Sequence, residues 1–179
     1  MSSGAAEGLR RHVRDISDFP KPGIVFKDLS PLFLDRDALR GATEILAGYA
    51  RSIEAAYVVS AEARGFVLGG AVAVAIGAGF ILARKPGKLP SATDSVEYQL
   101  EYGLDALEVH SDALPDGARV LVHDDLLATG GTAQALCGLV ERAGATVAGC
   151  AFVVELTFLG GRERLAPHEI FSLVAYESE

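Results

Sequence analysis

Residues 120–132 read Val-Leu-Val-His-Asp-Asp-Leu-Leu-Ala-Thr-Gly-Gly-Thr and are the most informative stretch of the chain. Apolar residues run into two adjacent carboxylates, Asp124 and Asp125, and a glycine-rich turn follows at once. Residues 133–142 then have the pattern of a helix. A buried strand, a turn without bulky side chains and a helix N-terminus together form an anion site, because backbone N–H groups point inward and the helix dipole is positive there.

The acidic pair adds a second chemistry to this anion site. Gly130 and Gly131 tolerate the positive φ that an inward-facing row of N–H groups requires, which suits a phosphate. Carboxylates instead suit hydroxyl groups and metal ions. A site that combines both predicts a sugar phosphate, with the acids on ribose hydroxyls and the turn on the phosphate. The stretch contains neither G-x-x-x-x-G-K nor G-x-G-x-x-G, which excludes a Walker A loop and a dinucleotide fingerprint.

The overall composition limits the class of protein. A chain of 179 residues, half of them hydrophobic, is long enough for one domain with its own core. No apolar run reaches the roughly 18 residues of a membrane span, and the N-terminus lacks a signal-peptide pattern, so we expect no membrane association and a cytoplasmic location. The formal net charge of −8 argues against nucleic acid as a partner. Cys137 and Cys150 predict buried free thiols rather than a metal site or a disulfide.

Strand-like and helix-like patterns alternate along the chain. Helices are predicted over 9–16, 37–53 and 66–76, with Asp35 or Asp37 as the cap of the second. Strands are predicted over 57–60, 80–83, 104–109, 119–123, 146–155 and 171–174. This alternation predicts an α/β fold with an open, mostly parallel twisted sheet flanked by helices on both faces. Ligands in such sheets lie beyond the C-terminal ends of the strands, which indicates the loops 61–65, 84–90 and 126–132.

A basic cluster is followed by an acidic segment. Arg84, Lys85 and Lys88 lie within five residues, whereas residues 89–118 contain no lysine or arginine and seven acids. We expect the cluster to serve an anionic small molecule rather than to be only a solvated surface. The polar, Pro- and Gly-marked segment 85–102 is predicted to be a mobile loop.

The stretch 120–132 closely resembles the phosphoribosyl-pyrophosphate (PRPP) motif of the type I phosphoribosyltransferases. Further blocks, in order along the chain, resemble the adenine phosphoribosyltransferase family: 19–28 (FPKPGIVFKD), 62–66 (EARGF), 84–90 (RKPGKLP), 100–103 (LEYG) and 154–157 (VELT). The resemblance covers nearly the whole chain from Phe19 to Tyr176. Several matching blocks in order are far more specific than any one of them.

This resemblance implies a fold, a reaction and a set of partners. The fold implied is that of a type I phosphoribosyltransferase, in a single domain over 1–179 with a small N-terminal hood at about 1–35 and a core at about 36–179. The reaction implied converts adenine and PRPP to AMP and pyrophosphate with Mg²⁺. Members of the family are usually homodimers, so we expect a homodimer whose other partners are these four small molecules.

The resemblance also implies which residues contact PRPP. The pyrophosphate group is assigned to Glu62, Ala63, Arg64, Arg84, Lys85 and Lys88. The 5-phosphate is assigned to Ala128, Thr129, Gly130, Gly131 and Thr132. Asp124 and Asp125 hold the ribose hydroxyls, and Mg²⁺ is held mainly by the substrate, with these two acids as its candidate protein ligands. In this family the Glu62–Ala63 peptide bond tends to be cis.

Adenine is assigned to Val25, Phe26, Lys27 and Leu156. In the family the residue at Val25 pairs with adenine through its main chain, and the aromatic ring at Phe26 stacks on the base. Core packing is the alternative role for Phe26 and for Leu156. Arg64, Lys85 and Glu101 are the candidate catalytic residues, and Tyr102 belongs to a loop that acts as a lid. Glu101 either accepts the N9 proton as a general base or only helps to close that lid.

Two positions depart from the family pattern. His123 stands where an apolar residue is usual, and is either a hydrogen-bonded core histidine or a group that alters the charge of the acidic pair. Lys27 stands where some relatives have arginine, and a lysine lacks the bidentate contact that an arginine makes.

Other functions remain open at this stage. A phosphoribosyltransferase for hypoxanthine, guanine or xanthine would share the PRPP motif but not the hood residues Val25 and Phe26. A non-catalytic regulator that senses PRPP or purines usually carries a DNA-binding domain, and only about eighteen residues precede the hood. A general nucleotide-binding α/β domain is weakened by the missing fingerprints.

Overall fold

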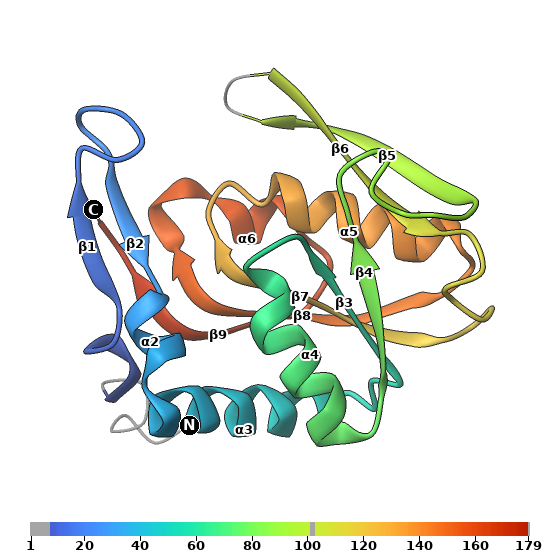
Figure 1. Ribbon diagram of the computed structural model, residues 1–179, viewed down its shortest axis with the longest axis horizontal. Helices are drawn as coiled ribbons and strands as arrows, with labels where there is room; N and C mark the ends of the chain where they lie inside the picture. Colours follow the sequence, from blue (N-terminus) through green and yellow to red (C-terminus); the bar gives the residue numbers. More distant parts are fainter. Residues whose placement is uncertain (1–7, 101–102, 179) are drawn as a thin grey trace.

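The computed structural model describes residues 8–100 and 103–178 and shows an α/β fold around one parallel sheet (Figure 1). The strand order is β4-β3-β7-β8-β9, and all neighbours in it are parallel. The bounds are β3 (Tyr57–Ala61), β4 (Gly79–Ala83), β7 (Arg119–Leu127), β8 (Thr146–Leu156) and β9 (Ile170–Tyr176). The predicted fold class is confirmed. After β3 the chain forms β4 on one side of β3, and it later forms β7 on the other side of β3. The strand order therefore reverses between β3 and β7, which makes this place the topological switch point of the sheet.

Helices cover both faces of this sheet, and each face has its own apolar core. The long helices are α3 (Arg36–Ser52), α4 (Gly65–Ile76) and α5 (Gly131–Arg142). Alternate residues of β7 divide between the two cores: Leu121 packs with α3 and α4, whereas Val120 and Val122 pack with α5. This alternation is the two-residue period of a strand buried on both faces. None of the described helices combines the length and the apolar character needed to cross a membrane.

Short helical segments connect the larger elements. They are α2 (Ser30–Leu34), the 3₁₀ turn η1 (Thr157–Leu159) and α6 (Gly161–Arg164). The last two follow β8 directly, so they lie at the C-terminal edge of the sheet, where ligands are expected.

Asp35 is the N-cap of α3, one of the two caps that the sequence indicates. Its carboxylate accepts hydrogen bonds from the backbone N–H groups of Asp37 (3.0 Å) and Ala38 (2.8 Å). Asp35→Ala should therefore lower the free energy of unfolding by about 1 kcal/mol, the usual effect of losing a cap. Asp35→Asn keeps an acceptor oxygen and serves as the control in a urea titration; equal stability of the Ala and Asn variants would contradict the capping role.

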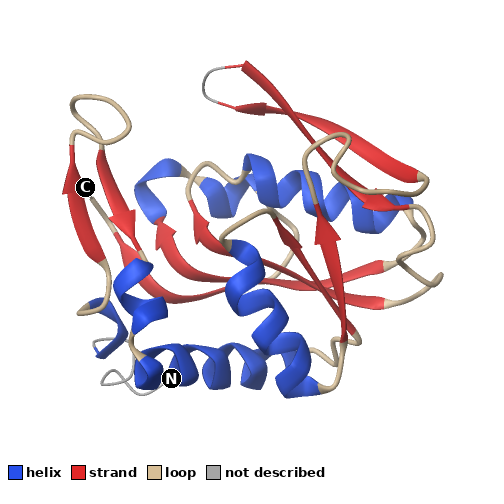
Figure 2. Cartoon of the chain, in the orientation of Figure 1, coloured by secondary structure: helices blue, strands red, loops and turns tan. Residues whose placement is uncertain are grey.

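Two small antiparallel sheets stand apart from the central sheet (Figure 2). β1 (Arg14–Ser17) pairs with β2 (Val25–Asp28), and β5 (Thr93–Leu100) pairs with β6 (Gly103–His110). The first sheet corrects the predicted helix over 9–16: among the described residues helix ends at Arg10, because the segment after it pairs with β2.

The second small sheet corrects the prediction of a mobile loop over 85–102. Residues 93–100 form β5, and the apolar side chains of Val96 and Tyr98 pack on the core that α5 also covers. Alternation of these apolar residues with polar ones is the pattern of a half-buried strand. The strand predicted at 104–109 is confirmed as β6.

Candidate active site

The candidate site lies at the switch point, where β3 and β7 both end. The strands are in register at Ser60 and His123, so β3 ends beside Asp124, and β7 continues to Leu127 before its following segment leaves the same edge of the sheet. The first leads into α4 and the second into α5, and each of these helices has 12 residues. Two helix N-termini therefore face one region, and each favours an anionic group through its free N–H groups and its dipole.

Two adjoining hollows open at this place and share a wall. The first has a volume of about 180 Å³ and is lined by Asp124 and by residues 126–133. The second has a volume of about 340 Å³ and is lined by Ala61, Glu62, Ala63, Arg64, Lys85, Tyr98, Asp105, Leu107, Asp124, Asp125 and Thr132. Asp124 and Thr132 line both. One elongated molecule can thus reach from one helix N-terminus to the other.

Small residues form most of the lining of the first hollow. Its residues Ala128, Thr129, Gly130, Gly131 and Thr132 are the five that the sequence assigns to one phosphate. Gly130 has a φ of +81°, which an L side chain rarely adopts, and it is the residue from which α5 starts. The turn can therefore direct its N–H groups into the hollow without covering them with side chains.

The acidic pair separates the two hollows. Asp125 is 3% exposed, and its Oδ2 lies 2.6 Å from Nε of Arg64. The backbone N–H of Asp125 donates a 2.9 Å hydrogen bond to Oδ1 of Asp124. Burial, and then the neighbouring charge of Asp125, raise the pKa of Asp124 well above its ordinary value. A Cβ on Gly65 would lie 2.8 Å from Oδ1 of Asp124, so a glycine at the start of α4 leaves room for this carboxylate.

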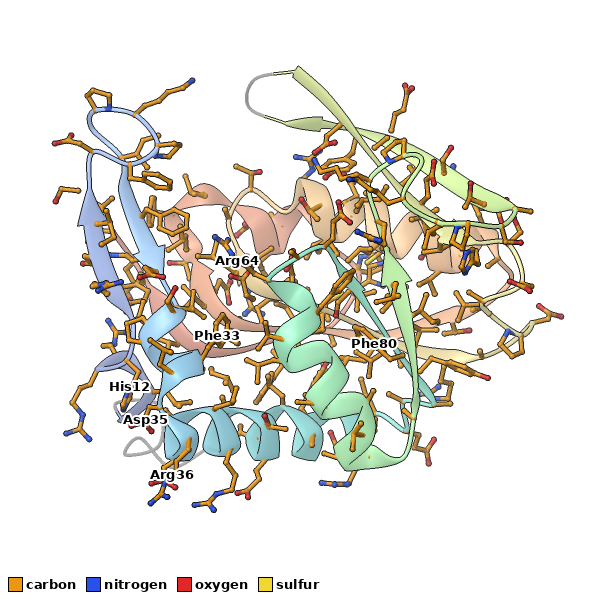
Figure 3. All side chains as sticks on the ribbon, in the orientation of Figure 1. His12, Phe33, Asp35, Arg36, Arg64 and Phe80 are labelled. Carbon is orange, nitrogen blue, oxygen red and sulfur yellow. The ribbon has the colours of Figure 1, made fainter. Side chains whose placement is uncertain are left out.

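Arg64 occupies the centre of the site. It lies at the N-terminal end of α4, between the β1–β2 sheet and the β5–β6 hairpin (Figure 3). Its guanidinium pairs with Asp125 on one side, and its Cζ lies 5.1 Å from the ring centroid of Phe26 on the other. The structure thereby brings a residue of the N-terminal segment next to the acidic pair.

Two further cations of the site, Lys85 and Arg84, are also paired with acids. Nζ of Lys85 is bonded to Oδ2 of Asp105, and this hydrogen bond raises the pKa of Lys85. Burial alone would raise the pKa of Asp105, but the bonds from Lys85 and the Ala106 N–H outweigh it, so that pKa is lowered. Nε of Arg84 lies 2.6 Å from Oε2 of Glu62, whose peptide bond to Ala63 is cis.

Lys88 differs from these cations. Its side chain is exposed, and its hydrogen bonds are made by the backbone: its carbonyl accepts from Arg84 at 3.3 Å, and its N–H donates to the carbonyl of Lys85 at 3.2 Å. The second hollow is lined by Arg64 and Lys85, with no contribution from Lys88.

The candidate base residues gather on β2 and at the end of β8. Phe26 is half-buried, and its ring also meets Phe19 edge-on with centroids 5.1 Å apart. Leu156, the last residue of β8, is partly buried and packs against the core on the α3 and α4 face. Lys27 is directed elsewhere: it is 3% exposed, with Nζ 2.9 Å from Asp15 and 4.5 Å from the ring centroid of Tyr176.

His123 lies inside the sheet rather than in either hollow. It is fully buried, and its Nδ1–H donates a 2.9 Å hydrogen bond to the carbonyl of Ala151. Burial lowers the pKa of His123 to about 4, so the ring is neutral near pH 7. This geometry favours the hydrogen-bonded core histidine over a group that alters the charge of the acidic pair.

Two polar lining residues, Tyr98 and Asp105, are not among those that the sequence predicts. Asp105 pairs with Lys85, and the hydroxyl of Tyr98 donates a 3.3 Å hydrogen bond to the same carboxylate. The two residues are cross-strand partners in the β5–β6 hairpin. The alternation of polar and apolar residues over 93–100 is the sequence signal that could have indicated this strand and, with it, the position of Tyr98. Glu101 and Tyr102 lie outside the described residues, between these two strands.

Comparison with known proteins agrees with this geometry. A family model described as the phosphoribosyl transferase domain matches residues 34–171. An adenine phosphoribosyltransferase from Rubrobacter xylanophilus is 55% identical over 94% of this chain and 91% of its own length. The chain belongs to the adenine phosphoribosyltransferase family. It is accordingly a transferase of the glycosyltransferase class that makes AMP and pyrophosphate from adenine and PRPP in purine salvage.

Solved structures of adenine phosphoribosyltransferases have the same fold. That of Thermoanaerobacter pseudethanolicus superposes with a TM-score of 0.93 at 46% identity, covering 96% of this chain and 99% of the other. That of Saccharomyces cerevisiae, solved with adenine and an imino-altritol bisphosphate, has a TM-score of 0.91 at 35% identity and covers 96% and 99%. The superposition on the Thermoanaerobacter pseudethanolicus enzyme and the five-stranded parallel sheet both show that the chain has the type I phosphoribosyltransferase fold.

Proposed function

We propose that the two hollows hold PRPP in one orientation, with its 5-phosphate on residues 128–132, hereafter the phosphate loop, and its pyrophosphate beside Arg64 and Lys85. The observation that carries this assignment is the shared wall: Asp124 and Thr132 line both hollows. With the ribose of PRPP held at that wall, the 5-phosphate would lie at the N-terminus of α5 and the pyrophosphate at the N-terminus of α4. Each anionic end then meets the positive end of a helix dipole.

The acidic pair would hold the ribose between these ends. The 2- and 3-hydroxyl groups donate hydrogen bonds, and carboxylates only accept them, so Asp124 and Asp125 are suited to this contact. Binding the hydroxyls would also supply Oδ2 of Asp125, a buried atom that meets Arg64 in an ion pair, with a well-directed hydrogen-bond donor. The ribose C1 would then lie beside Arg64, which already contacts Asp125.

Three cations would stabilise the leaving group: Arg64 and Lys85 line the second hollow, and Arg84 pairs with Glu62 of its lining. As the bond from ribose C1 to pyrophosphate breaks, the ribose gains oxocarbenium character and negative charge builds on the pyrophosphate. Arg64, Arg84 and Lys85 are each paired with a carboxylate. These ion pairs hold the cations in place, so little reorganisation is needed when the charge develops. Lys88 and the backbone of Glu62 and Ala63 would complete the pyrophosphate contacts.

Mg²⁺ fits this site as an ion held mainly by the substrate. The described residues contain no cluster of three or more His, Cys, Asp or Glu that could hold a metal. Two adjacent carboxylates, Asp124 and Asp125, are nevertheless available. Magnesium typically binds one or two carboxylates together with substrate phosphates, and when bound it neutralises part of the pyrophosphate charge.

Adenine would bind at the β1–β2 sheet. The ring of Phe26 would stack on the base, Leu156 would form the opposite wall, and the backbone of Val25 would pair with the purine edge. Backbone pairing distinguishes a 6-amino from a 6-oxo purine, because donor and acceptor roles are exchanged. Lys27 would support this strand through Asp15 rather than contact the base itself. Glu101 would take the N9 proton or help Tyr102 to close the site.

The wider assignments belong to the same proposal. The hood is the N-terminal part of the chain up to about residue 35, the core follows it from about residue 36 in the same domain, and the enzyme works as a cytoplasmic homodimer. Sedimentation of the purified protein tests the dimer.

The reaction is tested by offering adenine, hypoxanthine, guanine and orotate separately to the purified protein with Mg²⁺ and PRPP. Only adenine should yield product at a substantial rate; comparable turnover of hypoxanthine or guanine would contradict the base site assigned here.

Phe26→Ala should weaken adenine binding and leave PRPP binding nearly unchanged. A lost stacking contact costs about 1–3 kcal/mol per base, or roughly 5- to 150-fold in affinity. Phe19→Ala is the matched control, because Phe19 contacts the same ring but is half-exposed at its edge. Calorimetric titration decides between the outcomes: equal losses for adenine and PRPP, or equal effects of the two substitutions, would contradict the stacking role.

A further inference from the structure

A second segment of backbone lies directly against the phosphate loop. A Cβ built on Gly130 would lie 2.9 Å from the carbonyl oxygen of Gly161 and 3.2 Å from its Cα. A Cβ on Gly161 would lie 2.2 Å from the carbonyl oxygen of Ala128 and 2.9 Å from Cδ1 of Leu127. The start of α6 and the phosphate loop therefore touch backbone to backbone, and both glycines are buried.

An ion pair holds α6 in this position. Nε and Nη2 of Arg162 reach the two carboxylate oxygens of Glu155 at 2.9 and 2.6 Å, a bidentate contact. Nη1 of Arg162 also donates to the carbonyl of Ile170 at 3.1 Å. The hydroxyl of Ser172 donates to Glu155 at 2.5 Å. Arg162 thus connects α6 to β8 and β9 at once, through a carboxylate that is 2% exposed.

The location of Glu155 explains why this pair matters to the loop. Glu155 is in register with Leu127, the last residue of β7 before the phosphate loop begins. Burial alone would raise the pKa of Glu155, but the bonds from Arg162 and Ser172 lower it overall. The pair remains charged near pH 7. It fixes α6 next to the point where the loop leaves the sheet, and no residue of α6 lines the first hollow.

We propose that Arg162, through its ion pair with Glu155, is a positioning residue that presses Gly161 against Ala128 and Gly130 and so holds the phosphate loop in its binding conformation. This proposal rests on the proposed function, because it takes residues 128–132 as the 5-phosphate site. The loop is built from small residues and has few side chains of its own to hold it. A rigid neighbour supplies the rigidity that a preorganised row of N–H groups requires.

The test compares two ways of disturbing this contact. Arg162→Met removes the ion pair, and Gly161→Ala leaves the pair intact but inserts a methyl group against Ala128. In both variants the Kd for ribose 5-phosphate and the KM for PRPP should rise tenfold or more. The Kd for adenine and the kcat at saturating PRPP should stay within threefold. Arg162→Lys keeps one charged contact and should give an intermediate KM.

Matched controls separate positioning from general stability. Arg119 has almost the same side-chain exposure as Arg162 (46% against 47%) and bonds to the carbonyl of Ile53, at the opposite end of β7. Gly138 lies in α5, and a Cβ there would meet nothing within 4 Å. Arg119→Met and Gly138→Ala should leave the KM for PRPP within threefold of the wild-type value.

The outcomes are distinct. Equal losses for ribose 5-phosphate and adenine, or equal effects of Arg162→Met and Arg119→Met, would overturn the positioning role. If Arg162→Met does not fold because Glu155 is left unpaired, Gly161→Ala decides: an unchanged KM for PRPP overturns the proposal. Wild-type protein that binds no ribose 5-phosphate would instead contradict the 5-phosphate site itself.

Discussion

Asp125→Asn should lower kcat/KM by about 30-fold to several thousand-fold while the protein remains folded. The carboxylate is buried, faces the proposed ribose and is paired with Arg64 at 2.6 Å. Removing one partner of a buried charge pair costs about 2–5 kcal/mol, and each 1.4 kcal/mol corresponds to a factor of ten. Steady-state kinetics at saturating adenine, with circular dichroism to verify folding, measures the effect.

Asp124→Asn should lower turnover to a similar degree and also stabilise the ligand-free protein. Burial and the charge of Asp125 raise the pKa of Asp124 in the folded state. The stability that this shift contributes is present below the ordinary value of 3.8 and is lost as the pH rises towards the raised pKa. At pH 7 an asparagine avoids this loss, so Tm should rise by about 2–4 °C per kcal/mol relieved.

The control for both acids lies far from the site. Asp37 is exposed in the first turn of α3, the helix whose N-terminal residue Arg36 is labelled in Figure 3. Asp37→Asn breaks only surface ion pairs, which contribute little, so kcat/KM should not change. Folded Asp124→Asn and Asp125→Asn proteins with near wild-type kcat/KM would remove the acidic pair from the mechanism.

The central sheet and the turn that joins β7 to α5 could be predicted because their signals are local. Strands β3, β4, β7 and β8 are short apolar runs bounded by turns, and each is recognisable without knowing its neighbours. The loop, its acidic pair and the start of α5 lie within one contiguous stretch, residues 120–132. Parallel topology then brings the loop after β3 to the same edge of the sheet, so two sites distant in sequence become adjacent.

The features that escaped prediction depend on pairing between distant residues. Segment 85–102 was predicted as a loop because its Pro, Gly and polar content outweighs the alternation in β5, which becomes visible only against β6. The Asp105 partner of Lys85 is twenty residues away and depends on the register of that hairpin. The direction of Lys27 likewise depends on Asp15 across the β1–β2 sheet. Such contacts depend on the tertiary structure, and the secondary-structure propensities of single residues carry no information about it.

Lys85→Ala should lower kcat/KM for PRPP and weaken inhibition by pyrophosphate, while AMP binding stays comparatively intact. Lys85 follows β4, at the edge of the sheet where the second hollow opens. A hydrogen bond to a charged group contributes about 1.5–3 kcal/mol, which corresponds to roughly 10- to 150-fold in pyrophosphate affinity. AMP contains no pyrophosphate, so its binding should scarcely respond.

The pairing of Lys85 with Asp105 requires a second variant. In Lys85→Ala the Asp105 carboxylate loses its partner and itself repels the incoming pyrophosphate, so part of the loss measures that repulsion. Lys85→Ala/Asp105→Asn removes both charges and should recover some pyrophosphate affinity without restoring turnover, because the cation that stabilises the leaving group is still missing. Arg36→Ala, which removes an exposed charge from α3 far from the site, controls for net charge. If inhibition by AMP and by pyrophosphate weakened to the same degree in Lys85→Ala, Lys85 would act on the general field or on the fold, and its assignment to the leaving group would have to be withdrawn.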